Sequence, residues 1–161
     1  MLEKQLKTAL MQEALQEARA AADIGEIPIG AIVATRDGQI IGRGHNLREH
    51  TNDATTHAEI LAIREANQHL GSWRLEDCVI FVSLEPCPMC AGAILNSRLA
   101  EVYFGAFDPK AGAMGSVLDL FSYPKFNHHP EVYPGLFQDQ AAQMLKDFFR
   151  QIREQKKLAQ K

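Results

Sequence analysis

Apolar side chains recur about every four residues near the start of the chain, which predicts an amphipathic helix over residues 3–22. The positions that share this face are Leu6, Leu10, Ala14, Leu15, Ala18 and Ala21. Gly25 follows, and glycine suits the left-handed backbone that commonly ends a helix. The chain therefore opens with a helix that must bury one face against the rest of the molecule.

The pattern then changes to that of strands. Residues 27–35 are apolar and rich in β-branched side chains, and residues 39–44 form a second short run. Asp37-Gly38 between them predicts a tight hairpin turn in which both central residues have positive φ. Residues 45–56 are polar and rich in Asn, Asp and Thr, so we expect a loop there.

Helices and strands alternate after this loop. We expect a helix from about residue 57 to residue 70, capped by Thr55 or Thr56. A near-continuous apolar run at residues 78–83 predicts a strand buried on both faces. The next helix is expected over residues 88–96, because it begins with Pro88 and proline is favoured at a helix start.

The remaining elements complete the fold prediction. Residues 101–106 are expected to form a strand, residues 107–135 to be largely irregular with one helical turn around residues 117–120, and residues 137–157 to form the final helix. Strand–helix–strand units predict a parallel pair, while the hairpin adds an antiparallel one. We therefore predict an α/β fold with three layers, α/β/α, around a central mixed sheet, and one domain over residues 1–161.

Composition places this fold among ordinary globular proteins. Of the 161 residues, 46% are hydrophobic and 23% charged. No apolar run approaches the ~18 residues that span a bilayer, and the first residues lack the apolar centre of a secretory signal. The three cysteines make a disulfide framework improbable, so we expect a cytoplasmic location, no membrane partner, and Cys78 buried as a small apolar residue.

The charge is unevenly distributed along the chain. The formal net charge is −3, but residues 146–161 carry +4, which leaves −7 on residues 1–145. A basic last helix can follow the phosphates of a nucleic acid. It can equally be a solvated helix end whose cations suit the negative end of the helix dipole, and charge alone favours this second interpretation.

Two short motifs carry the candidate chemistry: His57-Ala58-Glu59 and Pro86-Cys87-Pro88-Met89-Cys90. One histidine and two cysteines suit tetrahedral Zn²⁺, and three protein ligands leave the fourth position open for water or hydroxide, as in catalytic zinc sites. We predict one Zn²⁺ per chain, held by these three residues, with Glu59 as the catalytic proton carrier. Both motifs lie at predicted helix starts, where open α/β sheets place their sites.

One condition must hold for this arrangement. Residues two apart within a regular helix point to nearly opposite sides. His57 and Glu59 can therefore converge only if His57 lies at or before the first turn of its helix.

Other interpretations of these residues remain open. A Cys-x-x-Cys pair alone can be redox-active, but that interpretation leaves His57 and Glu59 unexplained. A structural zinc site needs a fourth Cys or His, for which Cys78, His45 and His128 are candidates.

The chain also resembles a known family, the bacterial tRNA-specific adenosine deaminases of the cytidine-deaminase-like superfamily. Besides residues 56–59 and 84–93, the resemblance rests on residues 27–31, 44–46, 104–113, 115–116 and 127–128. The metal motifs define only the superfamily, whereas residues 104–116 and Asn127-His128 resemble the tRNA enzymes. Ala54 and Phe107 depart from the residues common in the family, which are proline at the first position and a polar or basic residue at the second.

The resemblance implies hydrolytic deamination of adenosine to inosine at the wobble position of a tRNA anticodon, with release of ammonia. It also implies that Asn46 hydrogen-bonds the target nucleoside, and that Asp108, Lys110 and Phe149 contact flanking nucleotides, Phe149 by stacking. The expected partners are the anticodon stem-loop of tRNA and a second copy in a homodimer. The alternatives are a deaminase of a free base or nucleoside (guanine, cytosine or cytidine) and a non-catalytic, zinc-stabilised RNA-binding subunit.

Overall fold

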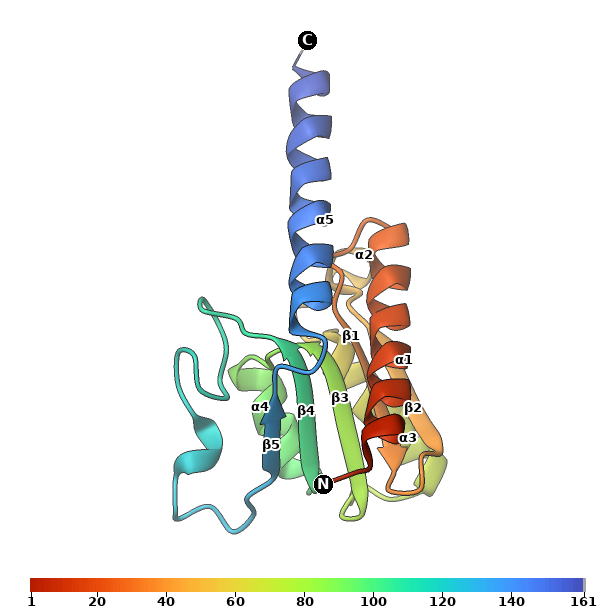
Figure 1. The fold of residues 1–161 in the computed structure, drawn as a ribbon, viewed down its shortest axis with the longest axis vertical. Coiled ribbons are helices and arrows are strands. Elements are labelled where there is room, and N and C mark those ends of the chain that lie inside the picture. Colours follow the sequence, from red (N-terminus) through yellow and green to blue (C-terminus); the bar gives the residue numbers. More distant parts are fainter. Residues whose placement is uncertain (161) are drawn as a thin grey trace.

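A five-stranded sheet forms the centre of the molecule (Figure 1). The computed structural model describes residues 1–160. The strands are β1 (Gly30–Thr35), β2 (Ile40–His45), β3 (Cys78–Leu84), β4 (Glu101–Ala106) and β5 (Glu131–Pro134), in the order β2-β1-β3-β4-β5. β1 is antiparallel to β2 and β3, whereas β3, β4 and β5 are mutually parallel, so the predicted mixed sheet is confirmed.

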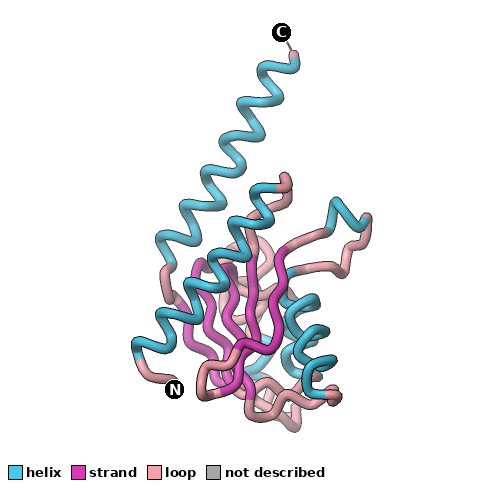
Figure 2. The backbone as a smooth tube through the Cα atoms, turned by 90° about the vertical axis from the view of Figure 1, so that its right-hand side faces the viewer, coloured by secondary structure: helices cyan, strands magenta, loops and turns pink. Residues whose placement is uncertain are grey.

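Helices cover both faces of this sheet (Figure 2). On one face, α1 (Lys4–Asp23) and the first turns of α5 (Gln138–Ala159) pack over side chains such as Phe81 and Tyr103. On the other face, α3 (Ala58–Leu70) and α4 (Pro88–Asn96) pack over Ile80, Val82 and Phe104. Each face therefore has its own apolar core, and the three-layer α/β/α prediction is confirmed.

Small residues let α3 approach the sheet closely. A Cβ atom at Gly44 would lie 2.3 Å from the backbone oxygen of Ala58, and one at Gly42 would lie 2.1 Å from that of Ala62. Any side chain at these glycines would push the helix outward. The first turn of α3 is thereby fixed beside the carboxyl end of β2, at the same end of the sheet as the carboxyl ends of β3 and β4.

The β1–β2 hairpin is closed differently from the prediction. Gly38 has φ +98°, but the preceding Asp37 does not share this conformation. Thr35 accepts a hydrogen bond from the N–H of Gly38 at 3.0 Å, and the strand register shifts between Val33 and Ala34. The connection is thus a longer loop in which one glycine supplies the only positive φ, and the expectation of two such residues was wrong.

Four further local predictions were wrong. The expected loop at residues 45–56 contains a short helix, α2 (Arg48–Thr51), and the helical turn expected around residues 117–120 is the 3-10 helix η1 (Leu120–Ser122). The stretch predicted as irregular also contains β5, whose four residues pair with β4. The residue that caps α3 is His57 in extended conformation, rather than either threonine before it.

The last helix extends well beyond the sheet, and its carboxyl end stands clear of the other elements (Figure 1). From Gln151 to Gln160 only Ile152 is partly buried, and the rest are exposed. None of the helices in residues 1–160 combines the length and apolar character needed to cross a bilayer.

Candidate active site

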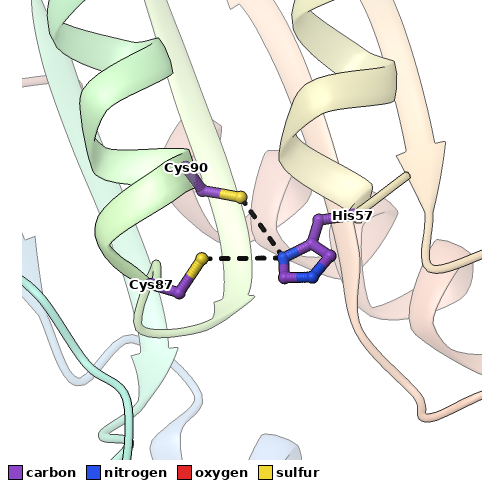
Figure 3. Close-up of side chains that lie close together, drawn as sticks. All are labelled: His57, Cys87 and Cys90. Atoms are coloured by element: carbon purple, nitrogen blue, oxygen red, sulfur yellow. Dashed lines mark hydrogen bonds between the residues drawn. The ribbon is translucent and has the colours of Figure 1, made fainter. Parts of the chain in front are cut away.

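Three side chains from two helix starts converge at the edge of the sheet (Figure 3). The Nδ1 atom of His57 lies 3.6 Å from the sulfur of Cys87 and 3.5 Å from that of Cys90. Bonds of about 2.3 Å to sulfur and about 2.0 Å to nitrogen, meeting at a tetrahedral angle, separate such atoms by roughly 3.6 Å. Both nitrogen–sulfur distances therefore match those around one zinc ion, and all three donor atoms lie within 4.8 Å of one another, so the group can bind a metal.

The backbone explains how these ligands meet. His57 is the N-cap of α3 with φ −75° and ψ 156°, and Cys87 is the N-cap of α4 with φ −73° and ψ 174°. Both residues are extended rather than helical, and Pro88 follows Cys87 as the first helical residue, as predicted. Because His57 precedes the first turn, its ring and the carboxylate of Glu59 can face the same site, which meets the condition stated from the sequence.

Glu59 is the unusual polar residue of this site. It is only 3% exposed, and its Oε1 is the one buried side-chain N or O atom without a hydrogen-bond partner in residues 1–160. Burial raises the pKa of this carboxyl to about 7. A buried carboxylate oxygen left without a partner is costly, and such groups mark places where a bound ion, water or substrate supplies the missing contact.

The sulfur of Cys87 is the more acidic of the pair. Hydrogen bonds with Cys90 and His57 outweigh its partial burial and lower the pKa of this thiol to about 4. Thiolates are the form in which cysteines bind metals, so the site is chemically suited to a cation.

A structural zinc site would need a fourth protein ligand. Within residues 1–160 the candidate metal group contains only His57, Cys87 and Cys90. His45 pairs with Glu17 at 3.1 Å, and His128 contacts the backbone oxygen of Leu99 at 2.7 Å. Cys78 is buried at the start of β3, as predicted. This donor set has the open position of a catalytic site.

A cavity of about 440 Å³ lies beside these ligands. It is bounded by the segments that leave the sheet at this edge, by the starts of α3 and α4, and by α5. Asn46 lines it and is 4% exposed; its Oδ1 accepts a hydrogen bond from the N–H of Arg48 at 3.1 Å. Asn46 therefore holds the loop after β2 in shape as well as facing the cavity.

The other predicted contact residues also line the cavity. Asp108 uses its Oδ1 to accept hydrogen bonds from the N–H groups of Lys110 and Ala111, at 3.0 and 3.2 Å, so it orders a turn. Lys110 lines the cavity and is exposed. Phe149 of α5 is 42% exposed and packs edge-on against Phe148. The fold brings all eight predicted site residues to one place.

Several cavity residues were missed as candidates from the sequence. Glu85, Phe107, Ile29 and Leu145 line the cavity beside the predicted residues. Glu85 offered a usable signal, because a charged residue that directly follows a buried apolar strand is unusual. In the sequence, Phe107 stands out only as a departure from the family; the residue is 44% exposed, and its ring stands at 90° to that of Phe104.

The fold and this donor set are those of a deaminase, and comparison with known proteins identifies the class. A model of the MafB19-like deaminase family matches residues 6–153. The curated tRNA-specific adenosine deaminase of Bacillus subtilis (strain 168) is 49% identical over 151 residues, which cover 94% of this chain and 93% of the relative. The chain belongs to the tRNA-specific adenosine deaminases within this family, and the resemblance found in the sequence is confirmed.

Solved structures give the same result. A chain from a study of A-to-I editing by tRNA:A34 deaminases at the wobble position of transfer RNA superposes with a TM-score of 0.82 at 46% identity, covering 86% of this chain and 99% of that one. A guanine deaminase from Bacillus subtilis is 38% identical, with a TM-score of 0.61 and coverage of 74% and 75%. The same fold therefore serves both an RNA substrate and a free base in these relatives.

Proposed function

We propose that this protein deaminates adenosine to inosine at the wobble position of a tRNA anticodon, releasing ammonia. The observation that carries the proposal is the convergence of His57, Cys87 and Cys90 beside Glu59, whose Oε1 has no hydrogen-bond partner, in the wall of a cavity. Family membership supports the substrate, because the relatives of 47–49% identity are named tRNA-specific adenosine deaminases.

One Zn²⁺ per chain, held by His57, Cys87 and Cys90, would lower the pKa of a water molecule to about 7 and so supply a nucleophile at neutral pH. Glu59 accepts a proton from that water and delivers it to N1 of the adenine ring as oxygen bonds to C6. The Glu59 carboxylate then takes the remaining proton from the hydroxyl on C6 and passes it to the exocyclic amine; the C6 carbonyl of inosine forms as the C6–N6 bond breaks, and ammonia leaves. Water and adenosine are thereby converted into inosine and ammonia.

The positions of the other predicted residues in the cavity wall support the roles that we propose for them. We propose that Asn46 hydrogen-bonds the target nucleoside. Its Nδ2 donates to the backbone oxygen of Ile27 at 3.4 Å and its Oδ1 accepts from the N–H of Arg48 at 3.1 Å, and each of these groups can form one further bond. Asp108 and Lys110 line the cavity from the segment after β4, and Phe149 lines it from α5. We propose that these three contact the nucleotides that flank the target, with the partly exposed ring of Phe149 stacking on a base.

A second candidate function is deamination of a free base. The 38% identical guanine deaminase shares the fold, and the same zinc and glutamate chemistry would apply. A purely structural zinc protein that binds RNA without activity is disfavoured, because such a site needs no buried carboxylate with a free oxygen.

The deciding experiment compares substrates directly. Purified protein with its metal is incubated with an anticodon stem-loop carrying a wobble adenosine, the same stem-loop carrying guanosine there, free adenosine, guanine, cytosine and cytidine, and ammonia release is followed. We expect turnover of the first substrate in strong preference to the others. Faster turnover of guanine would replace the proposed substrate by a free base, and no turnover of any substrate by metal-loaded protein would favour the RNA-binding subunit.

We further propose that residues 1–161 act as one deaminase domain in a cytoplasmic homodimer. The continuous sheet supports the single domain, and the family resemblance supports the dimer. Light scattering after size-exclusion chromatography should give about twice the mass of the 17.9 kDa chain.

A further inference from the structure

Glu85 is a second buried carboxylate in this cavity, and the proposed chemistry does not use it. It is 2% exposed and lies between the end of β3 and Cys87. Its Oε1 accepts hydrogen bonds from the N–H of Asp108 at 3.0 Å and from the hydroxyl of Ser116 at 2.5 Å. Its Oε2 accepts from the N–H groups of Met114 and Ser116 at 3.0 and 3.1 Å.

These four bonds saturate the carboxylate. A carboxylate has about four lone-pair sites, two on each oxygen, and in Glu85 each oxygen already accepts two hydrogen bonds. Glu59 differs, because its Oε1 has no partner. Glu85 therefore has no acceptor capacity left for substrate, and any effect on the reaction must pass through the groups that it holds.

The groups that Glu85 holds all belong to one segment, residues 107–116. Its bonds fix this segment near both ends, and the N–H of Ala113 adds a bond to the backbone oxygen of Pro86 at 2.9 Å. A Cβ atom at Gly112 would lie 2.3 Å from the carboxyl carbon of Glu85, so the backbone closes directly around this group.

The same segment forms one wall of the cavity. Phe107, Asp108 and Lys110 line the cavity from it, and the turn that carries Lys110 is ordered by Asp108, whose own N–H is bound to Glu85. The position of this wall relative to the metal ligands therefore depends on a carboxylate that lies two residues before Cys87 in the same chain.

We infer that Glu85 is a positioning residue that holds the segment 107–116 against the metal-binding turn and thereby sets the affinity for the nucleotides flanking the target adenosine. This inference rests on the proposed function for its substrate. A shift of about 1 Å in substrate-positioning groups can cost up to 10²-fold in rate. Glu85→Gln keeps the size of the side chain but points an NH2 donor at groups that are themselves donors.

The test uses full-length, zinc-loaded protein and three substitutions. Glu85→Gln removes the acceptor, and Ser116→Ala removes one of the four bonds. The matched control is Glu101→Gln, because Glu101 is also 2% exposed and accepts a hydrogen bond from Tyr103 at 2.9 Å. It begins β4, whereas Glu85 follows the end of the neighbouring β3, so these residues lie roughly 15 Å or more apart.

Two readouts separate positioning from general destabilisation. We expect Glu85→Gln to raise KM for the stem-loop by roughly ten- to a hundredfold, with a smaller change in kcat and with full zinc content. Ser116→Ala should raise KM by severalfold, and Glu101→Gln should lower the melting temperature without raising KM. Hydrogen exchange of the backbone N–H groups in residues 107–116 should accelerate in Glu85→Gln but not in Glu101→Gln.

Other results overturn the inference. If KM is unchanged in Glu85→Gln, or if KM rises equally in Glu101→Gln, Glu85 only contributes to stability. If Glu85→Gln loses its zinc, the role of Glu85 is to support the turn that carries the metal ligand Cys87. If Glu85→Gln does not fold, Ser116→Ala decides by the same KM and exchange criteria. If the wild-type protein does not deaminate the stem-loop, the proposed function is wrong, but the role of Glu85 can still be tested. In that case hydrogen exchange in residues 107–116, together with KM for whichever substrate the wild-type protein does deaminate, decides whether Glu85 is a positioning residue.

Discussion

Replacement of Glu59 separates catalysis from metal binding. In residues 1–160 its Oε1 has no hydrogen-bond partner, so Glu59→Gln breaks no bond at that oxygen and preserves the shape of the side chain. The ligands His57, Cys87 and Cys90 form the metal group without it. We therefore expect Glu59→Gln and Glu59→Ala to keep both the fold and the zinc, while deamination is lost.

The size of the loss follows from the proton transfers assigned to Glu59. A positioned general acid or base contributes about 10²–10⁴ to the rate. One lost transfer therefore raises the activation free energy by about 2.7–5.4 kcal/mol, since a tenfold change in rate equals about 1.36 kcal/mol. Because the same carboxyl carries a proton both to N1 and to the leaving amine, kcat should fall by several orders of magnitude, with little change in stem-loop affinity.

Three measurements on the same samples test this reasoning. Inosine formation in the stem-loop is followed under single-turnover conditions, zinc is measured per chain by mass spectrometry, and the thermal melt reports the fold. The control is Glu101→Gln, a buried glutamate at the first residue of β4, which should deaminate at the wild-type rate. Loss of zinc from Glu59→Ala would make Glu59 a ligand, and a rate within tenfold of wild type would refute its role as proton carrier.

The remaining predictions concern metal binding, the loss of folding stability at acidic pH, and the last helix. We expect about one zinc ion per chain in the wild type, and Cys87→Ser should lose it and should melt at a lower temperature; zinc-free protein with full activity would contradict the metal site. Glu26→Gln should cost roughly 1–3 kcal/mol at pH 7, measured by urea unfolding, because hydrogen bonds from His50 and the N–H of Glu49 outweigh burial and lower the pKa of Glu26 below 4.5. This stabilisation exists above the unfolded-state pKa and is lost as pH falls through the lower folded-state pKa, so the difference from wild type should shrink below about pH 4.5. Removal of residues after Arg150 should leave the zinc site intact but weaken the salt dependence of stem-loop binding. The slope of log binding constant against log salt concentration should become shallower by about 0.7–0.9 for each lost phosphate contact, and identical slopes would mean that the end of α5 is only a solvated helix.

The sequence was sufficient where one local pattern determined both structure and chemistry. Pro88 predicted the start of α4, and the observed helix begins and ends at the predicted residues. The strand predicted at residues 101–106 is β4 with the same bounds. The metal group followed from the spacing of two cysteines and a histidine, because the chemistry of zinc restricts the ligand types and the helix starts restrict their positions.

Local pattern was insufficient where a distant partner decides the structure. β5 has only four residues, and its register comes from pairing with β4, for example Tyr133 beside Tyr103. α2 is held by Glu26, which lies more than twenty residues earlier and accepts hydrogen bonds from the N–H groups of Glu49 and His50. Neither short element has enough residues to show a period, so its own sequence gives no sufficient signal.

The two cavity glutamates show what spacing cannot decide. Glu59 lies two residues after one metal ligand, and Glu85 lies two residues before another. Both are buried, with 3% and 2% of their surface exposed, and both line the same cavity. Their hydrogen bonds separate them: Glu85 accepts four, whereas Glu59 leaves one oxygen without a partner. An oxygen with free lone pairs can exchange protons with a substrate, whereas a saturated carboxylate can only hold its donors in place, so the two residues are expected to affect kcat and KM respectively.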